Sequence, residues 1–209
     1  MEGDVKLGVL GREARRKQLV DVAIKIFAKK GYSAASVNDI AKAARVARGT
    51  FYLYFKDKAD VLAAVLENYR MELEFMVRFY MKRTGRMTVA GCRAWLREEV
   101  GTWLEFFEMH REALKIILFE RDCIDAKFVR KRDEAKGILK WHLTSKFQRM
   151  QKAGKIRSDV SPEALCIFEM ALLNEVFTMQ ILPYKEPDVE ALVEQWAGFE
   201  WRGVRRSRA

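Results

Sequence analysis

The sequence predicts an all-α protein built from an N-terminal unit of three short helices and a longer helical domain. Only 12 Gly and 3 Pro occur in 209 residues, too few for the many turns of a sheet protein. Apolar residues recur three and four positions apart along most of the chain, as on one face of a helix. We expect the first domain at residues 1–58, the second at 59–201 and a disordered basic tail at 202–209.

The N-terminal unit is predicted from its apolar spacing and its helix caps. A helix over residues 12–30 carries one apolar stripe and ends at Gly31. Ser36 and Asp39 resemble a capping box that begins a second short helix. A break at residues 45–47 precedes a third helix, in which Phe51 and Phe55 lie on one side.

The second domain is predicted to contain six helices. Asp57 caps a long helix that ends near residue 82, and further helices are expected over residues 88–109, 113–119 and 124–152. Ser161 followed by Pro162 is the strongest helix start in the chain, and its helix extends to about residue 182. A last helix covers residues 188–201.

Charge is segregated along the chain, although the net charge is +10. Residues 1–58 carry 13 Lys and Arg against 6 Asp and Glu, and residues 111–157 carry 14 against 6. Residues 158–201 carry 1 against 9. The basic N-terminal unit suits a polyanion such as DNA, whereas the acidic segment would be repelled from it. The basic residues at 111–157 are also explained by a helix face that is exposed to solvent and binds no DNA.

Several classes of protein are disfavoured by what the sequence lacks. Three cysteines without a CxxC pair argue against a disulfide scaffold and a structural zinc site. The N-terminus has no signal-peptide pattern. No stretch of about 18 uncharged residues occurs, so the sequence predicts no membrane span. The sequence therefore favours a cytoplasmic protein with no cofactor and no metal.

Residues 36–58 have the layout of a helix-turn-helix, in which the second helix is exposed. With the two phenylalanines facing inward, helical geometry turns outward Arg48, Thr50, Tyr52 and Leu53. These side chains offer a guanidinium, two hydroxyls and an apolar group, which together suit base edges and phosphates in a major groove. A small helical bundle with ordinary surface aromatics is the less favoured interpretation.

The segment VNDIAKAARVARGTFYLYFKDKADVL, residues 37–62, resembles the DNA-binding signature of TetR-family transcriptional regulators. The resemblance covers about residues 12–66. It implies a homodimer that binds a palindromic operator, as a repressor, and leaves it when a small ligand enters the C-terminal domain. By this resemblance, the residues that face the bases are Arg48, Gly49, Thr50 and Leu53. The residues that contact phosphates are Tyr52, Tyr54 and Lys58, and those of the second helix that contact the DNA backbone are Ser36 and Asn38.

Two turn residues depart from the family pattern. The family usually has a glycine and then a small hydroxyl cap, where this chain has Arg45 and Ala47. We therefore expect a non-glycine residue in the left-handed region and a third helix without a side-chain cap, each at a cost of about 1 kcal/mol.

Dimerisation and ligand binding are assigned to the second domain. The helix at 161–182 is apolar nearly all round, so it is expected to pair with the helix at 188–201 in an intersubunit four-helix bundle, with Phe177 and Trp196 in the interface. A cavity for an apolar or aromatic effector is expected in this domain, lined by Trp103, Phe107, Leu139, His142 and Phe168. The alternative is that the same aromatic residues belong to an ordinary filled core.

Two other functions are weighed against a ligand-responsive regulator. One is an architectural protein that binds DNA without sequence preference, using the basic run at 111–157. The other is a helical enzyme, although no GxSxG, GxGxxG or P-loop motif and no metal-ligand spacing occurs. We therefore predict no catalytic residues.

Overall fold

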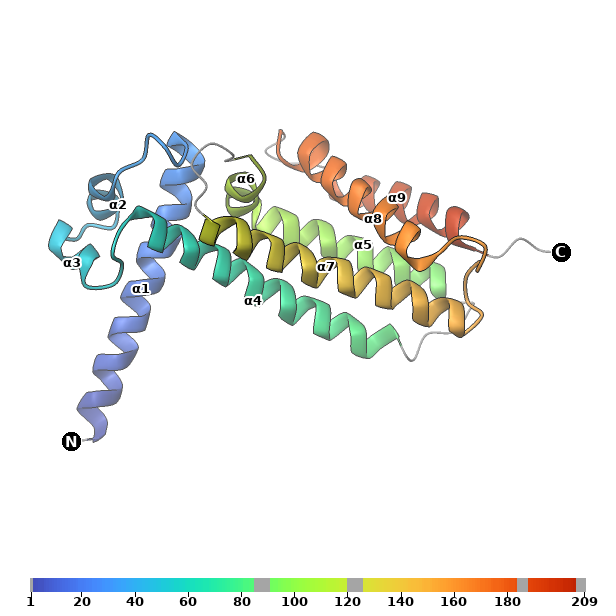
Figure 1. Cartoon of the computed structure of the whole chain (residues 1–209), viewed down its shortest axis with the longest axis horizontal. Helices are drawn as coiled ribbons and strands as arrows, with labels where there is room; N and C mark the ends of the chain where they lie inside the picture. Colours follow the sequence, from blue (N-terminus) through green and yellow to red (C-terminus); the bar gives the residue numbers. More distant parts are fainter. Residues whose placement is uncertain (1, 85–90, 120–125, 184–187, 206–209) are drawn as a thin grey trace. The chain divides into compact units, whose positions relative to one another are not determined.

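The prediction of an all-α protein is confirmed by the fold. The computed structural model describes residues 2–84, 91–119, 126–183 and 188–205, and these residues contain helices but no strand (Figure 1). The elements are α1 (Glu2–Lys30), α2 (Val37–Ala43), α3 (Arg48–Tyr52), α4 (Lys58–Thr84), α5 (Cys92–Met109), α6 (Arg111–Phe119), α7 (Ala126–Lys152), α8 (Pro162–Val176), the π-helix η1 (Phe177–Ile181) and α9 (Val189–Val204).

Two compact units make up the chain. The first comprises residues 1–71 and 112–134, and the second comprises residues 72–111 and 135–209. The long helices α4 and α7 each contribute residues to both units. This division therefore differs from the boundary after residue 58 that the sequence suggests.

Helix α2 begins where its cap was predicted. The Ser36 hydroxyl accepts a hydrogen bond from the Asp39 amide at 3.2 Å, and the Ser36 amide donates to the Asp39 carboxylate at 2.9 Å. Asp57 accepts from the Asp60 amide at 2.8 Å at the start of α4. Phe51 and Phe55 are both buried, as expected. The caps fix where α2 and α4 begin, and the two buried phenylalanines fix which side of α3 faces inward.

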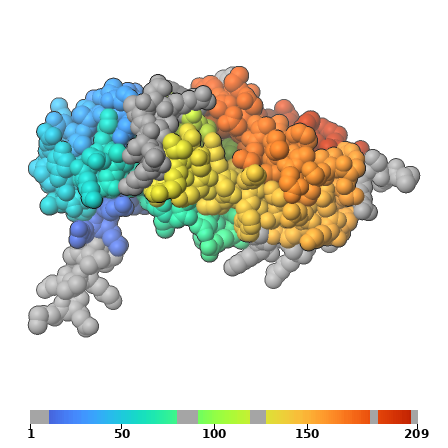
Figure 2. Space-filling model, viewed as in Figure 1, coloured from blue at the N-terminus to red at the C-terminus, as the bar shows by residue number. Residues whose placement is uncertain are grey.

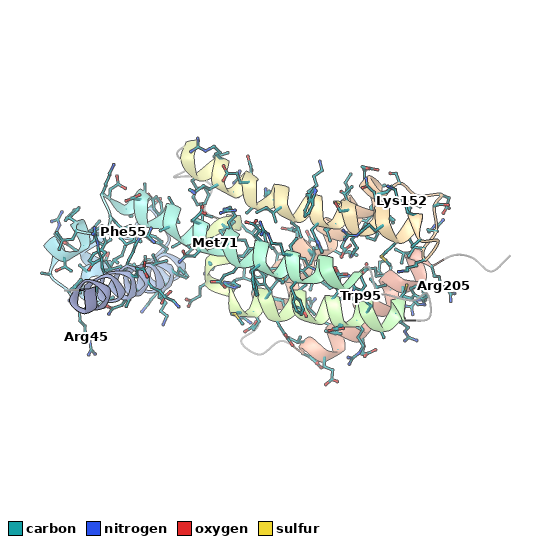
Figure 3. All side chains as sticks on the ribbon, turned by 90° about the horizontal axis from the view of Figure 1, so that it is seen from below. Arg45, Phe55, Met71, Trp95, Lys152 and Arg205 are labelled. Atoms are coloured by element: carbon teal, nitrogen blue, oxygen red, sulfur yellow. The ribbon has the colours of Figure 1, made fainter. Side chains whose placement is uncertain are left out.

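Both predicted departures are present in the turn between α2 and α3. Arg45 has φ 56°, in the left-handed region that favours glycine, and its side chain points outward (Figure 3). Ala47 is the N-cap of α3 and provides no side-chain hydrogen bond. The turn nevertheless closes, because the amide of Val46 donates to the carbonyl of Ala41 at 3.0 Å.

The helix that begins at Ser161 changes type near its end, which the sequence analysis did not predict. The Ser161 hydroxyl accepts from the Ala164 amide at 3.2 Å, so the predicted start is confirmed. Buried residues then recur every four positions, at Leu165, Glu169, Leu173, Phe177 and Ile181. A spacing of four drifts around an α-helix of 3.6 residues per turn, and the wider turn of η1 offsets this drift.

Other helix ends also differ from the prediction, most of all at α1, which begins at Glu2 and not near residue 12. Helix α9 continues to Val204, and the carbonyl of Val204 accepts from the Arg157 amide at 2.8 Å. The expected tail at 202–209 is therefore wrong for residues 202–204, which are helical, while residues 206–209 lie outside the described part. The predicted helix segments 88–90 and 124–125, and the turn residue Pro187, also lie outside it.

One stretch among the described residues, Pro162–Ile181, is long and apolar enough to cross a membrane. Length and composition alone are weak evidence for a span, since core helices of soluble proteins meet the same test. A third of this stretch is buried inside the protein, including the acidic side chain of Glu169. A core helix with one exposed apolar face explains these features better than a span does.

Lys58 at the start of α4 holds the turn between α1 and α2. Its ammonium donates to the carbonyls of Tyr32 at 2.6 Å, Ala35 at 2.9 Å and Ser33 at 3.2 Å. It also lies 4.3 Å from the centroid of the Tyr32 ring. An ammonium has three N–H groups, so these three carbonyls use its whole donor capacity.

We expect Lys58→Ala to lower the free energy of unfolding by about 1–3 kcal/mol, because three carbonyls would lose a charged donor. Urea unfolding followed by circular dichroism measures the change. Lys56→Ala is the matched control, since Lys56 is an exposed neighbour, and we expect it to leave the midpoint within error. Equal midpoints for the two variants would show that Lys58 does not support this turn.

Candidate nucleic-acid interface and interior site

Helix α3 presents the side chains that the sequence assigns to base contacts. Arg48, Tyr52 and Leu53 are exposed, Leu53 by 71%, and Thr50 is half-buried. Residues 36–58 form the cyan surface in Figure 2. In this arrangement the Arg48 guanidinium donates to the Tyr52 hydroxyl at 3.2 Å, so the two groups support each other in the free protein.

The remaining predicted DNA contacts lie around α3. Gly49 is exposed, and a Cβ at this position would meet no atom within 4 Å, so a phosphate or base can approach the backbone closely. Asn38 and Ser36 are exposed on α2, and Tyr54 is half-buried after α3. Ser36 already accepts one hydrogen bond as a cap. These assignments remain predictions.

An ion pair fastens α2 to the end of α1. The Lys30 ammonium lies 2.6 Å from the Asp39 carboxylate. Hydrogen bonds from Lys30 and Ser36 lower the pKa of Asp39 to about 2. Gln18 of α1 adds a hydrogen bond to the carbonyl of Ala44, at 3.2 Å. Helix α2 is thus held at both ends.

The interior of the second unit brings together three of the five predicted ligand residues. The Trp103 ring centroid lies 6.1 Å from those of both Phe107 and His142, and all three side chains are buried. Leu139 is half-buried. Phe168 is 59% exposed, so its predicted place in the interior is wrong. It lies on the exposed apolar face of α8, which periodicity alone cannot distinguish from the buried face.

The described cavity of about 290 Å³ lies in the first unit, not beside these aromatic residues. It is lined by residues 27–31 at the end of α1 and by Lys115 and Ile116 of α6. Lys115 donates to the carbonyl of Ala28 at 3.2 Å. Among the residues that the structure describes, no group of three or more His, Cys, Asp or Glu is placed to hold a metal.

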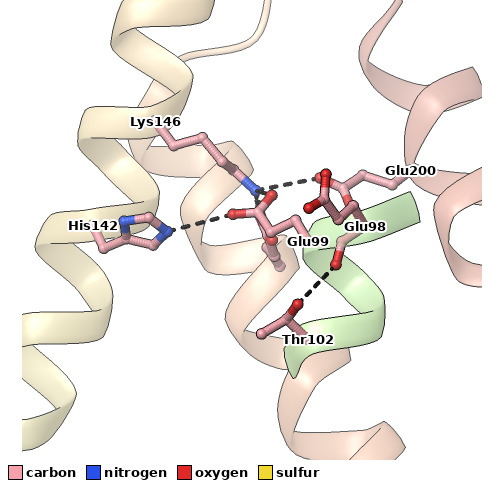
Figure 4. Close-up of polar contacts among 7 residues, drawn as sticks. Glu98, Glu99, Thr102, His142, Lys146 and Glu200 are labelled. Carbon is pink, nitrogen blue, oxygen red and sulfur yellow. Dashed lines mark hydrogen bonds and ion pairs between the residues drawn. The ribbon is translucent and has the colours of Figure 1, made fainter. Parts of the chain in front are cut away.

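A buried ionic cluster that the sequence analysis missed lies next to His142. The Lys146 ammonium contacts the carboxylates of Glu169 at 2.6 Å, Glu99 at 3.1 Å and Glu200 at 3.5 Å. His142 Nε2 lies 3.4 Å from Glu99 Oε1 (Figure 4). We call these five residues the Lys146 cluster. It joins α5, α7, α8 and α9, and each member is less than 10% exposed.

Burial and charge perturb the acids and the base of the Lys146 cluster in different directions. Burial, together with the neighbouring carboxylates, raises the pKa of both Glu169 and Glu200. For Glu99, the opposing effect of burial is outweighed by Lys146 and His142, which lower its pKa. Burial alone would lower the pKa of Lys146, but the three carboxylates raise it.

A sequence signal for this cluster exists. Ala135, His142 and Lys146 continue one row on α7, and Ala135 marks that row as buried. Glu169 and Glu200 similarly interrupt the apolar rows of α8 and α9. A charged residue on a buried row needs an opposite charge, which is how the acids and Lys146 could have been paired.

Comparison with known proteins identifies a family signature in the N-terminal part of the chain. Residues 19–65 match the description "Bacterial regulatory proteins, tetR family". The chain is 39% identical over 69 residues to the HTH-type transcriptional regulator AcrR of Shigella flexneri, and the match covers 31% of this chain and 32% of AcrR. The chain thus spans about a third of the length of that curated relative.

Solved structures resemble the fold over nearly the whole chain. The fatty acid degradation regulator FadR from Bacillus halodurans has a TM-score of 0.74 at 24% identity, covering 92% of this chain and 97% of that one. FadR from Bacillus subtilis, in complex with stearoyl-CoA, has a TM-score of 0.72 at 19% identity, covering 90% and 99%. The sequence match lies in the helix-turn-helix, and the fold match extends through the second unit. Residues 19–65 therefore carry the signature of the TetR family of bacterial regulatory proteins, and the fold of the chain resembles solved structures of such regulators.

Proposed function

We propose that the chain is a cytoplasmic transcriptional repressor that binds a palindromic DNA operator as a homodimer and releases it when a small effector binds. The exposed face of α3 carries the proposal, because Arg48, Tyr52 and Leu53 are exposed while the opposite side of the helix is buried through Phe51. The relatives are described as regulators, which supports a role outside catalysis. The alternative function, an architectural DNA-binding protein, is supported by a single feature, the exposed lysines of α7.

The contacts divide into sequence-reading and positioning groups. Arg48, Thr50 and Leu53 face base edges, and Gly49 allows the backbone to approach. Tyr52, Tyr54, Ser36 and Asn38 bind phosphates. Lys58 contributes charge at the start of α4, but its three N–H groups are already donated to carbonyls. A phosphate contact by Lys58 therefore requires one of these hydrogen bonds to be exchanged.

Selection of duplexes from a random pool tests the DNA-binding proposal. We expect the purified protein to enrich a palindrome with half-sites about 34 Å apart and to prefer it over unrelated duplexes by about 10³ or more. We expect Arg48→Ala to weaken binding to the selected site by about 1–3 kcal/mol and to relax the preference at one position of each half-site.

Arg78→Ala is the matched control, since Arg78 is an exposed arginine in the second unit. We expect this variant to select the same palindrome as the unaltered protein. Binding of unrelated duplexes within a few-fold of one another would support the architectural function instead.

The dimer is proposed to form through the exposed faces of α8, η1 and α9. Ile167, Phe168, Met179 and Phe199 are each 59–63% exposed, which is unusual for large apolar side chains on three consecutive elements. Phe177 and Trp196, the interface residues expected from the sequence, are buried within their own chain. They support the fold of each subunit, and the exposed set replaces them in the proposed interface.

We expect Phe199→Glu to yield folded monomers, because a charge would be buried at the centre of an apolar interface. Light scattering measures the mass, and circular dichroism verifies that helicity is retained. Phe75→Glu is the control, since Phe75 of α4 is 75% exposed and lies outside the proposed interface. If the Phe199 variant remains a dimer of unchanged affinity, the interface lies elsewhere.

The effector is proposed to be apolar or aromatic and to bind beside Trp103, Phe107, Leu139 and His142. The Bacillus subtilis FadR structure contains stearoyl-CoA, and another structural neighbour, SmeT, was solved with triclosan. Both compounds combine an apolar part with a polar group. Trp103 Nε1 and His142 Nδ1 are buried without a hydrogen-bond partner among the described residues, so an apolar ligand with a polar group can satisfy one of them.

Stearoyl-CoA and triclosan are suitable probes for this site. We expect one of them to quench tryptophan emission and to lower affinity for the selected operator by about 5–150-fold, and operator DNA to lower affinity for the probe by the same factor. Trp103→Phe should remove most of the quenching without abolishing binding. Tight binding of a probe with unchanged operator affinity would separate the interior site from regulation.

A further inference from the structure

The Lys146 cluster contains more negative than positive charge although its side chains are almost completely buried. Three carboxylates face one ammonium, so the formal charge is −2 with a neutral imidazole and still −1 if His142 is protonated. The charged side chains that face one another are Glu99 of α5, His142 and Lys146 of α7, Glu169 of α8 and Glu200 of α9. An isolated buried charge is costly, so at least one further cation is required.

The geometry limits that cation to a proton. Glu200 Oε2 is buried with no hydrogen-bond partner among the described residues. Its exposed area is below that needed for contact with a water molecule, so a hydrated ion does not fit beside it. A proton needs no space of its own.

Distances to Lys146 indicate which acid carries the proton. Both oxygens of Glu169 lie 2.6–2.7 Å from the ammonium, and Glu99 is held by Lys146 and His142 together. Glu200 has a single contact, at 3.5 Å. Glu200 is therefore the acid whose negative charge is least compensated.

Two acids of the Lys146 cluster are next in sequence to residues of the exposed apolar face of the second unit. Buried Glu169 follows exposed Phe168 on α8, and buried Glu200 follows exposed Phe199 on α9. Because Lys146 contacts both acids, it links the two helices that present this face. A change in charge at either acid therefore occurs one residue away from an exposed phenylalanine.

We propose that the Lys146 cluster binds one proton, carried by Glu200, and that its loss in alkaline medium weakens the link between α8 and α9 and thereby the dimer. The part that concerns the dimer rests on the proposed function, whereas proton binding does not. A proton bound by the folded chain at a pH where the unfolded chain has released it stabilises folding. This stabilisation is complete at acidic pH and is lost as the pH rises through the titration of Glu200 in the folded protein.

Unfolding at a series of pH values tests proton binding. As the pH rises above the ordinary titration range of a glutamate, and until Glu200 of the folded protein is itself ionised, we expect the ratio of folded to unfolded protein to fall by up to about tenfold per pH unit, the value for one proton. Glu200→Gln carries a neutral amide of nearly the same shape, so its ratio should fall less steeply and exceed that of the unaltered protein at alkaline pH. Glu190→Gln is the matched control on α9, because Glu190 is 86% exposed, and it should retain the steep fall.

An infrared measurement tests whether the Lys146 cluster holds a proton even if Glu200→Gln fails to fold, and loss of the band in a folded Glu200→Gln assigns that proton to Glu200. A protonated carboxylic acid has a C=O band separate from that of a carboxylate, and the band should be present in the unaltered protein and in Glu190→Gln at neutral pH. Its absence in both would overturn the proposal. Equal pH slopes for a folded Glu200→Gln and the control would also overturn it.

Sedimentation across the same pH range tests the link to the dimer. We expect the dissociation constant of the dimer to rise with pH in the unaltered protein and in Glu190→Gln, but to change less in Glu200→Gln. A pH-independent dimer would refute the link while the infrared band still decides proton binding. Monomers at every pH would refute the proposed dimer, and with it the link, but would leave the steep unfolding profile and the band unchanged.

Discussion

The arrangement of the second unit depends on the Lys146 ammonium more than on any other single group. It contacts acids from α5, α8 and α9 while belonging to α7, so one side chain connects four helices. Removing one partner of a buried ion pair typically costs about 3–5 kcal/mol, because the remaining charges stay buried. Apolar residues of similar volume would fill this space but would not require these four helices to meet at one point.

The DNA-binding motif is organised by local contacts of a different kind. Ser36, Asp39 and Asp57 fix helix starts through hydrogen bonds to residues three positions away. Such contacts can be predicted because their partners are close in sequence and their chemistry is specific to helix starts. The same holds for the strained turn at Arg45, where the absence of glycine was evident before its φ of 56°. This part of the fold was therefore predicted almost residue by residue.

Predictions failed where the deciding partner is distant in sequence. Periodicity correctly gave α8 as apolar nearly all round, but it could not tell that Phe168 faces outward while Glu169 faces inward. The preference of Glu169 for the interior comes from Lys146, 23 positions earlier. Likewise Phe177 and Trp196 were assigned to an interface because an apolar residue has the same pattern whether its own chain or another subunit covers it. The π-helix followed from a drift in spacing that becomes evident only when the buried residues are known.

Each of the two units is held together by a different kind of interaction. A core held by apolar packing resists change in proportion to the area it buries. A buried ionic cluster instead offsets a large desolvation cost with strong local attraction, so its net contribution to stability is small while its sensitivity to any added charge is high. In this chain that sensitive cluster includes His142, whose ring centroid lies 6.1 Å from that of Trp103. It also includes Glu169 and Glu200, which are next in sequence to exposed Phe168 and Phe199. Few residues therefore separate the aromatic interior from the exposed face.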